Sequence, residues 1–376
     1  MKKPRLAAIE YIRGVSMLGV VGIHVGAAYL GQHMTPEAVA NPHIVALLEI
    51  FTRFSVPIFF FISAFGLFYN LDLSQPFVYK DFIKRRYKAV VVPYVVWSLF
   101  YIIHYCILWG DPGPLNPITI LYDLFFGLAN YQLYFMVLLI WFYLLMPLWV
   151  WLVKHLDIMK LALLLLFQIG INYVLCFLWN PYTVTNPILQ KFLIHHLNYW
   201  VIHYVFIFLL GGYLAVHMDE FMRFMEKYRS QIVVAFWTTV VAHLGYYYYL
   251  LNVRGYTPLE GVATAHQLAP TGVIYTLGAS IFFFTIFTVW QLPERCRPVL
   301  ALLGKHSYFV YLAHPLALTY LGFLYDDLGI LLTAPMTIFY YLLVVAATLL
   351  LAVGMRRLGE HYPIINKATI GVYPKK

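Results

Sequence analysis

The sequence predicts an all-α, polytopic integral membrane protein with about ten transmembrane helices and both termini in the cytoplasm. Its 376 residues are 62% hydrophobic and only 11% charged, whereas a soluble domain is about 45–50% apolar and about 25% charged. Apolar windows of about 20 residues, the length that crosses a bilayer as a helix, recur along the chain. Basic residues gather in alternate loops between these windows.

The expected helices follow from these windows in order. They cover residues 11–31, 44–69, 89–109, 133–153, 161–179, 198–217, 231–251, 271–290, 307–327 and 336–355. The second and ninth are the least regular, because one contains Pro57 and the other ends in two aspartates. The loops 110–132, 180–197 and 252–270 carry the Gly, Pro and Asn residues typical of turns. None is long enough for a second domain, so we expect residues 1–376 to form a single transmembrane domain.

Lys and Arg residues orient these helices, since they favour cytoplasmic loops. With a cytoplasmic N-terminus, that side holds 21 of the 25 basic residues. The opposite loops hold only Lys191 and Arg254, and Arg13 and Arg53 lie inside helices. A miscounted helix would reverse this alternation, and no reversal is present. The net charge of +9 therefore reflects topology, and no basic stripe interleaved with aromatic residues predicts nucleic-acid binding.

Two further features bound the class of protein. The first apolar stretch contains Arg13 and His24 and is followed by more spans, so we expect no cleaved signal peptide. The three cysteines are scattered and predict neither a disulfide framework nor a CxxC pair. Neither a P-loop, a GxGxxG after a strand nor a GxSxG elbow is present, and the remaining histidines lack metal-ligand spacing. We therefore expect no metal site.

The first helix contains the leading candidate residues. Arg13 and His24 are eleven positions apart, which is within about 20° of three helical turns, so both side chains lie on one stripe roughly 16 Å apart. Glu10 can pair with Arg13 one turn away. Ionisable groups inside a membrane helix indicate function by default, because their burial is costly. A neutral His24 could act as a general base or nucleophile, or could simply bond to a neighbouring helix.

The second helix adds Glu49 and Arg53, one turn apart and at a depth comparable with that of His24. The carboxylate could orient the imidazole and the guanidinium could hold a phosphate or an oxyanion. Alternatively, the two form an ion pair that only fixes packing. Ser63 adds a hydroxyl on the same helix, or serves close helix packing together with Gly66.

Two other segments could contribute. Lys84, Arg85 and Arg86 precede the third helix on the cytoplasmic side, where they could bind the phosphates of a nucleotide-like donor or could equally orient the helix and bind lipid headgroups. His314 begins the His-Pro pair of the ninth helix, which we expect to start near His306. Pro315 loosens the helix ladder there, so His314 could line a substrate tunnel or cap a freed carbonyl.

Together these segments resemble the bacterial membrane acyltransferase-3 family, which transfers acyl groups to cell-surface glycans and related acceptors. The stretch RLAAIEYIRGVSMLGVVGIHVG is similar to the family's first helix, including the arginine–ten residues–histidine spacing. FSVPIFFFISAFGLFY, FIKRRYKAVVVPYVVW, YQLYFMVLLIWFYLLMPL, FLLGGYLA and HSYFVYLAHPLAL resemble later motifs in the same order. The chain departs from the family at Glu10, often Asp, and at Gln132, Leu133 and Tyr134, often His-Leu-Trp.

The resemblance implies the chemistry. It implies an acyl-coenzyme A donor, here expected to be acetyl-coenzyme A, bound from the cytoplasm, and a glycan or glycolipid acceptor. It assigns His24 a catalytic role, Arg13 an essential supporting role and the basic loop a donor-phosphate role. We add Glu49 to the catalytic set and place Glu10, Arg53, Ser63, Tyr311 and His314 along the substrate path. The expected location is the bacterial cytoplasmic membrane.

Two rival interpretations remain at this stage. One is a proton-coupled transporter or flippase of a glycan precursor or small solute, with Arg13, His24 and Glu49 as the path; the lack of an internal repeat argues against it. The other is a polysaccharide-synthesis scaffold without catalysis. The sequence does not determine the acceptor, the acyl length, the oligomeric state or whether an acyl-enzyme forms.

Overall fold

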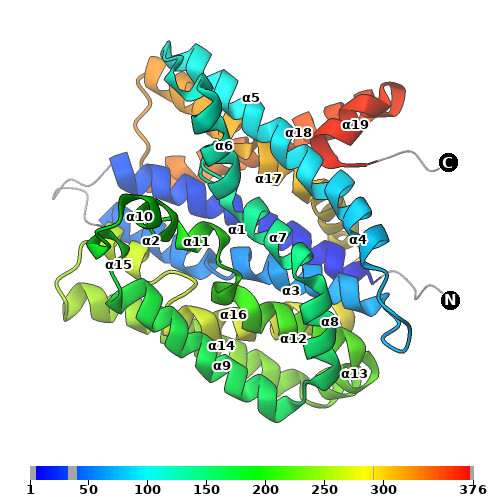
Figure 1. Ribbon diagram of the computed structural model, residues 1–376. Helices are drawn as coiled ribbons and strands as arrows, with labels where there is room; N and C mark the ends of the chain where they lie inside the picture. The colour runs from blue at the N-terminus through cyan, green and yellow to red at the C-terminus, as the bar shows by residue number, and fades with distance from the viewer. Residues whose placement is uncertain (1–5, 33–39, 291, 373–376) are drawn as a thin grey trace. The chain divides into compact units, whose positions relative to one another are not determined.

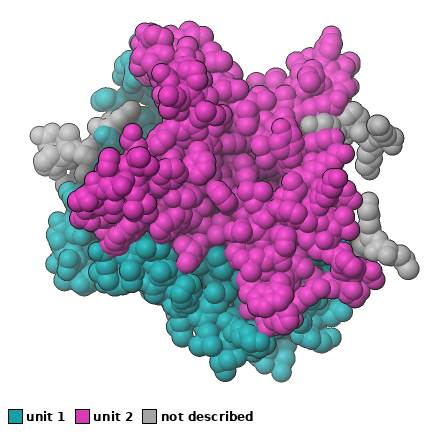
Figure 2. All heavy atoms as spheres, viewed as in Figure 1, with its two compact units in different colours: residues 1–71, 157–178, 204–350 teal, residues 72–156, 179–203, 351–376 magenta. Residues whose placement is uncertain are grey.

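The computed structural model describes residues 6–32, 40–290 and 292–372, and these residues form helices joined by turns, with no strand among them (Figure 1). They separate into two compact units, coloured in Figure 2. Unit 1 comprises residues 1–71, 157–178 and 204–350, and unit 2 comprises residues 72–156, 179–203 and 351–376. The all-α prediction is confirmed, and each unit is described by itself.

Unit 1 contains both long and short helices. They are α1 (Ala7–Gln32), α2 (Ala40–Thr52), α3 (Ser55–Tyr69), α9 (Ile158–Tyr173) with a π-helical turn (Val174–Leu178), α12 (Val205–Val216), α13 (Met218–Lys227), α14 (Arg229–Asn252), α15 (Pro258–Thr264), α16 (Pro270–Thr288), α17 (Cys296–Asp327) and most of α18 (Ala334–His361).

Unit 2 contains the remaining helices and the end of α18. They are α4 (Tyr79–Arg86), which continues through a π-helical turn (Tyr87–Val91) into α5 (Val92–Trp109), then α6 (Pro117–Phe126), α7 (Tyr134–Leu144), α8 (Met146–His155), α10 (Pro187–Leu193), α11 (His196–Tyr199) and α19 (Pro363–Ile370), with 3-10 turns at Gly113–Leu115, Pro181–Thr183 and Val201–Tyr204.

Seven helices in the described part of the chain are long and apolar enough to cross a membrane, or nine if two bent pairs each count as one span. The bent pairs are α7 with α8, at 66°, and the 201–216 segment with α13, at 96°. The place of the seventh expected span, 231–251, is taken by the uninterrupted α14, which is not among these nine. The chain is therefore a polytopic membrane protein, and the cytoplasmic location of its termini stays a prediction.

The predicted second helix is broken in its middle. Helix α2 ends at Thr52 and α3 begins at Ser55. Pro57 explains the break, because a proline ring clashes with the carbonyl four residues earlier, here that of Arg53. The helix resumes when the Ile58 N–H donates to the Phe54 carbonyl at 3.1 Å. Arg53 therefore lies at a break inside a membrane-spanning segment.

Helices α1 and α17 pack closely at glycines. A Cβ added to Gly14 would lie 3.0 Å from the Leu300 carbonyl oxygen, and one added to Gly304 would overlap the Glu10 carbonyl. Ten residues further along each helix, the His24 ring stacks on the His314 ring. Since both numbers rise together, the two helices run parallel, as the predicted topology requires of its first and ninth helices.

The expected start of the ninth helix near His306 is wrong. Helix α17 begins at Cys296, so His306 lies ten residues inside it and is buried. Nothing in residues 296–306 breaks a helix after its first turn, and packing of Gly304 on α1 stabilises this stretch although it carries Lys305.

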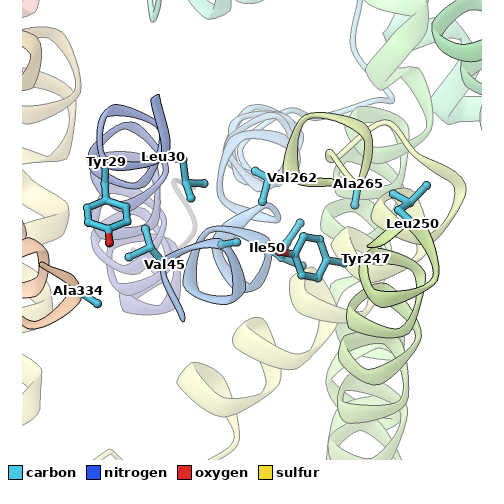
Figure 3. Packing of buried hydrophobic residues seen from close by; sticks show 10 residues of the cluster. Tyr29, Leu30, Val45, Ile50, Tyr247, Leu250, Val262, Ala265 and Ala334 are labelled. Carbon is cyan, nitrogen blue, oxygen red and sulfur yellow. The ribbon is translucent and has the colours of Figure 1, made fainter. Parts of the chain in front are cut away.

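A buried cluster joins the end of α1 to α2, α14 and α15 (Figure 3). Tyr29 and Leu30 come from α1, Val45 and Ile50 from α2, and Tyr247 from α14. Each is at most 4% exposed. This cluster packs the C-terminal end of α1 against α2, the helix that carries Glu49 and Arg53.

Candidate functional site

The predicted stripe on the first helix is present. Helix α1 is uninterrupted from Ala7 to Gln32, so the spacing of Arg13 and His24 places both on one face. Both side chains are partly buried. Glu10 is also partly buried, and its carbonyl contacts the helix crossing at Gly304.

His24 meets a second histidine that the sequence places 290 positions away. The rings of His24 and His314 stack with centroids 5.2 Å apart and planes inclined by 24°. His314 is fully buried, and Tyr311, also buried, has its ring 6.4 Å from that of His314. The structure therefore brings together three of the residues singled out in the sequence.

His314 is held by the proline that follows it. Pro315 has no N–H to give to the carbonyl of Tyr311, four residues earlier. The Nδ1 of His314 takes that place, lying 2.8 Å from the Tyr311 oxygen and 3.2 Å from the Val310 oxygen. Since carbonyls only accept, Nδ1 carries the proton and Nε2 is the basic nitrogen of the neutral ring. The capping interpretation is thus confirmed, and it fixes the tautomer of His314.

Glu49 and Arg53 form the predicted ion pair on α2. The Arg53 guanidinium donates to the Glu49 carboxylate at 2.5 Å and to the Val262 carbonyl at 3.1 Å. The Glu49 side chain is 2% exposed and that of Arg53 is 13% exposed. Within the described residues, the second carboxylate oxygen of Glu49 has no hydrogen-bond partner. The pair therefore has an acceptor left over for a bound group.

Arg53 is the electrostatic centre of the site. Its charge acts on three imidazoles, those of His24, His243 and His266. The interaction with His24 agrees with the predicted common depth of the two residues. A cation surrounded by neutral or basic rings can stabilise negative charge that develops beside them.

His243 and His266 are two further residues near Arg53 that no sequence pattern singled out. His243 is buried on α14 and its Nδ1 lies 2.9 Å from the Thr271 hydroxyl. His266 lies in the turn before α16, where its Nδ1 accepts from the Leu268 N–H at 3.0 Å. Burial, together with the charge of Arg53, lowers the pKa of His266 to about 4. No motif marked either histidine, because each lies about 200 residues from Arg53 in the sequence.

Ser63 is partly buried on α3. The alternative that Gly66 serves close helix packing with it is wrong, because a Cβ at Gly66 would meet no atom within 4 Å. The close approach of α3 is made elsewhere, where Gly211 of α12 packs on the backbone of Phe61. Tight packing there requires a residue without a side chain, and the sequence offers several glycines that could supply it.

The basic cluster at residues 84–86 belongs to unit 2, and its members differ. Lys84 and Arg85 are exposed on α4. Arg86 is partly buried, with its guanidinium carbon 5.4 Å from the ring centroids of both Phe82 and Tyr143. The aromatic contacts hold Arg86 in place, so two freely accessible cations and one fixed cation are available to an anion.

No three His, Cys, Asp or Glu side chains gather as a metal site among the residues that the structure describes. The site comprises two stacked imidazoles, an ion pair with a spare acceptor, and a guanidinium whose charge also acts on two further rings.

Comparison with known proteins defines the class. A family model described as an acyltransferase domain matches residues 6–357. The chain belongs to this acyltransferase family, and its described residues include helices long and apolar enough to cross a membrane.

More particular relatives are distant. Two Staphylococcus epidermidis proteins, one from strain RP62A, are described as probable poly-beta-1,6-N-acetyl-D-glucosamine export proteins. Each is 23% identical over 166 residues, which is 42% of this chain. The match spans 41% of the length of these relatives. No solved structure matches the chain.

Proposed function

We propose that the protein transfers a short acyl group, most simply acetyl, from acyl-coenzyme A to a hydroxyl of a cell-surface or exported glycan. The observation that carries the proposal is the stacked pair of His24 and His314, placed within electrostatic reach of Arg53. A ring of this kind can accept a hydroxyl proton, and a nearby guanidinium can stabilise an oxyanion.

The proposed step balances as follows. The basic nitrogen of His24 takes the acceptor hydroxyl proton while the hydroxyl oxygen bonds to the thioester carbonyl carbon. The tetrahedral oxyanion is stabilised by Arg53, which Glu49 holds in place. When the carbon–sulfur bond breaks, the coenzyme A thiolate takes the proton back from His24. The products are an acyl ester and free coenzyme A, and His24 returns to its neutral form.

Binding of the acyl-coenzyme A donor is assigned to Lys and Arg side chains. Lys84 and Arg85 are exposed on α4 and suit the phosphates of coenzyme A, with Arg86 fixed beside them by its aromatic contacts. Arg13 lies nearer the start of α1 than His24 and is assigned to the donor side of the same stripe. The protein is assigned to the bacterial cytoplasmic membrane with both termini inside.

Release of free coenzyme A tests the enzymatic step. Purified protein is given labelled acetyl-coenzyme A and a glycan acceptor, and the thiol and the acylated glycan are both measured. His24→Ala should lower transfer by about 10²–10⁴-fold, the usual contribution of a general base. His155→Ala, at an exposed histidine of α8, is the matched control and should retain transfer. A folded His24→Ala protein with full transfer would overturn the proposal.

A second candidate is a glycan exporter, favoured by the description of the two Staphylococcus relatives as probable export proteins. In that case His24, Arg53 and Glu49 would form a proton or substrate path. An exporter moves labelled glycan across a vesicle membrane without releasing coenzyme A. Transport without thiol release would favour this candidate, and thiol release with acylated glycan would favour the transferase.

A further inference from the structure

Unit 1 contains a cavity of about 580 Å³ that the proposed reaction does not use. Helices α1, α2, α14, α16 and α18 line it. Small-molecule sites in proteins usually measure about 300–1,000 Å³, so this cavity is large enough for a ligand.

The cavity lies on the back of the helix that carries His24. Gly19, Gly22 and Gly26 of α1 line it. At about 100° per residue, Gly22 is roughly 200° from His24 around the helix axis. The cavity therefore faces away from the stripe of Arg13 and His24 on this helix.

The wall of the cavity offers an apolar surface. Its three hydroxyl-bearing side chains already donate within the protein: Thr52 to the Glu49 carbonyl at 3.0 Å, Thr337 to the Thr333 carbonyl at 2.9 Å and Tyr341 to the Leu18 carbonyl at 3.1 Å. The rest of the lining is aliphatic, aromatic or glycine, including Phe54, Phe236 and Phe283. A sugar or phosphate would lose hydrogen bonds to water in this cavity and find few protein groups to replace them. A hydrocarbon chain makes no such hydrogen bonds and would lose none.

The mouth of the cavity is continuous with the lipid-facing surface. Leu48, Trp237 and Ile338 line the cavity and are 50%, 50% and 48% exposed. Leu48 and Ile338 belong to segments long and apolar enough to span the membrane, so their exposed sides contact bilayer hydrocarbon. Deeper wall residues, Phe54 and Phe236, are at most 3% exposed. The cavity thus leads from the bilayer into the protein.

We propose that this cavity binds one acyl chain of a bilayer phospholipid, which packs on the glycine face of α1. The chain packs on α1 at Gly22, beside Tyr341 of α18 and Thr52 of α2, and so supports the catalytic helix from behind. The proposal is independent of the acyl donor and acceptor.

Gly22→Leu is the sharpest variant. A Cβ at residue 22 would lie 3.7 Å from Tyr341 Cε2 and 3.9 Å from Thr52 Cγ2, which are ordinary contacts. The leucine side chain would then occupy the cavity without moving the backbone. Gly31→Leu is the matched control on the same helix, where an added Cβ meets no atom within 4 Å. Ile338→Trp, which narrows the cavity from its half-exposed mouth, serves as a second variant if Gly22→Leu does not fold.

The experiment uses phospholipid with a photoactivatable group in one acyl chain, and labelled peptides are mapped after reconstitution. The wild type and Gly31→Leu should be labelled at deep wall residues such as Phe54 and Phe236. Gly22→Leu should lose most of that labelling, roughly tenfold, while labelling at Leu350, which is 73% exposed on α18, stays unchanged. Added phospholipid should also raise the melting temperature of delipidated wild type more than that of Gly22→Leu.

Three results would overturn the proposal. One is labelling of the exposed surface alone, with deep wall residues untouched in the wild type. Another is a different occupant, such as an isoprenoid lipid that co-purifies and blocks the phospholipid label. A deep label that Gly22→Leu and Ile338→Trp both leave unchanged would likewise contradict it.

Discussion

Gly304→Ala perturbs the crossing of α1 and α17 by a single methyl group. An added Cβ would overlap the backbone carbonyl of Glu10, and a backbone atom cannot rotate away as a side chain can. Overpacking of this kind costs about 1–3 kcal/mol, and the overlap places this variant at the upper end. Alanine regains about 1 kcal/mol of helix propensity, so the net loss should be about 2 kcal/mol.

Gly354→Ala should change the stability of the protein in the opposite direction. Gly354 lies inside α18, and an added Cβ would meet no atom within 4 Å. Here only the propensity term of about 1 kcal/mol applies, and the protein should be stabilised. Thermal unfolding in detergent, followed by tryptophan fluorescence, should place Gly304→Ala several degrees below wild type and Gly354→Ala slightly above it.

Transfer activity adds a second readout. The shift that Gly304→Ala imposes separates α1 from α17, so His24 moves relative to His314. Since a displacement of about 1 Å can cost about 10²-fold, transfer should fall at least tenfold below wild type at a temperature where both are folded. A Gly304→Ala protein that melts at or above wild type and transfers normally would refute the close crossing.

Three further predictions concern the site. Arg53→Met should destabilise by about 3–5 kcal/mol because it leaves the buried Glu49 carboxylate unpaired, and adding Glu49→Gln should recover most of this in a melting assay; equal melting of single and double variants would contradict the coupling. Pro315→Ala returns an N–H to the carbonyl that His314 caps, so kcat should fall about tenfold, less than loss of a general base, with stability unchanged or higher; unchanged kcat would argue against a positioning role. Because the pKa of His266 is lowered to about 4 from 6.5, its neutral ring stabilises the fold fully above pH 6.5 and this stability is lost as pH falls toward 4, by at most about 3 kcal/mol. His266→Gln should flatten the melting temperature between pH 7 and 4.5, and parallel curves would contradict it.

Much of the site followed from local rules in the sequence. The spacing of Arg13 and His24 fixed their common face as soon as the helix was assumed, and the Glu49–Arg53 pair followed from one helical turn. The helix break at Arg53 could also be predicted from the sequence, since the ring of Pro57 clashes with the carbonyl four residues earlier. The carbonyl cap of His314 follows from Pro315 by the same rule.

Other parts depend on contacts between distant segments. The stacking of His24 on His314 needs the parallel packing of α1 and α17, which rests on Gly14 and Gly304 meeting across 290 residues. The charge of Arg53 acts on His266 only because α15 packs against α2. The start of α17 was misplaced because the charged residues before His306 suggested a membrane boundary, whereas packing on α1 extends the helix through them.

The close contact of α1 and α17 at Gly14 and Gly304 is a pivot about which the angle between the two helices can change. The His24–His314 pair lies ten residues, or about 15 Å, from this pivot along the helix axes. A change of about 4° in the angle between the helices would therefore shift one ring by about 1 Å past the other. Helix tilt responds to bilayer thickness, so transfer measured in lipids of graded chain length should pass through a maximum. A rate independent of thickness would show that the rest of the unit holds the angle fixed.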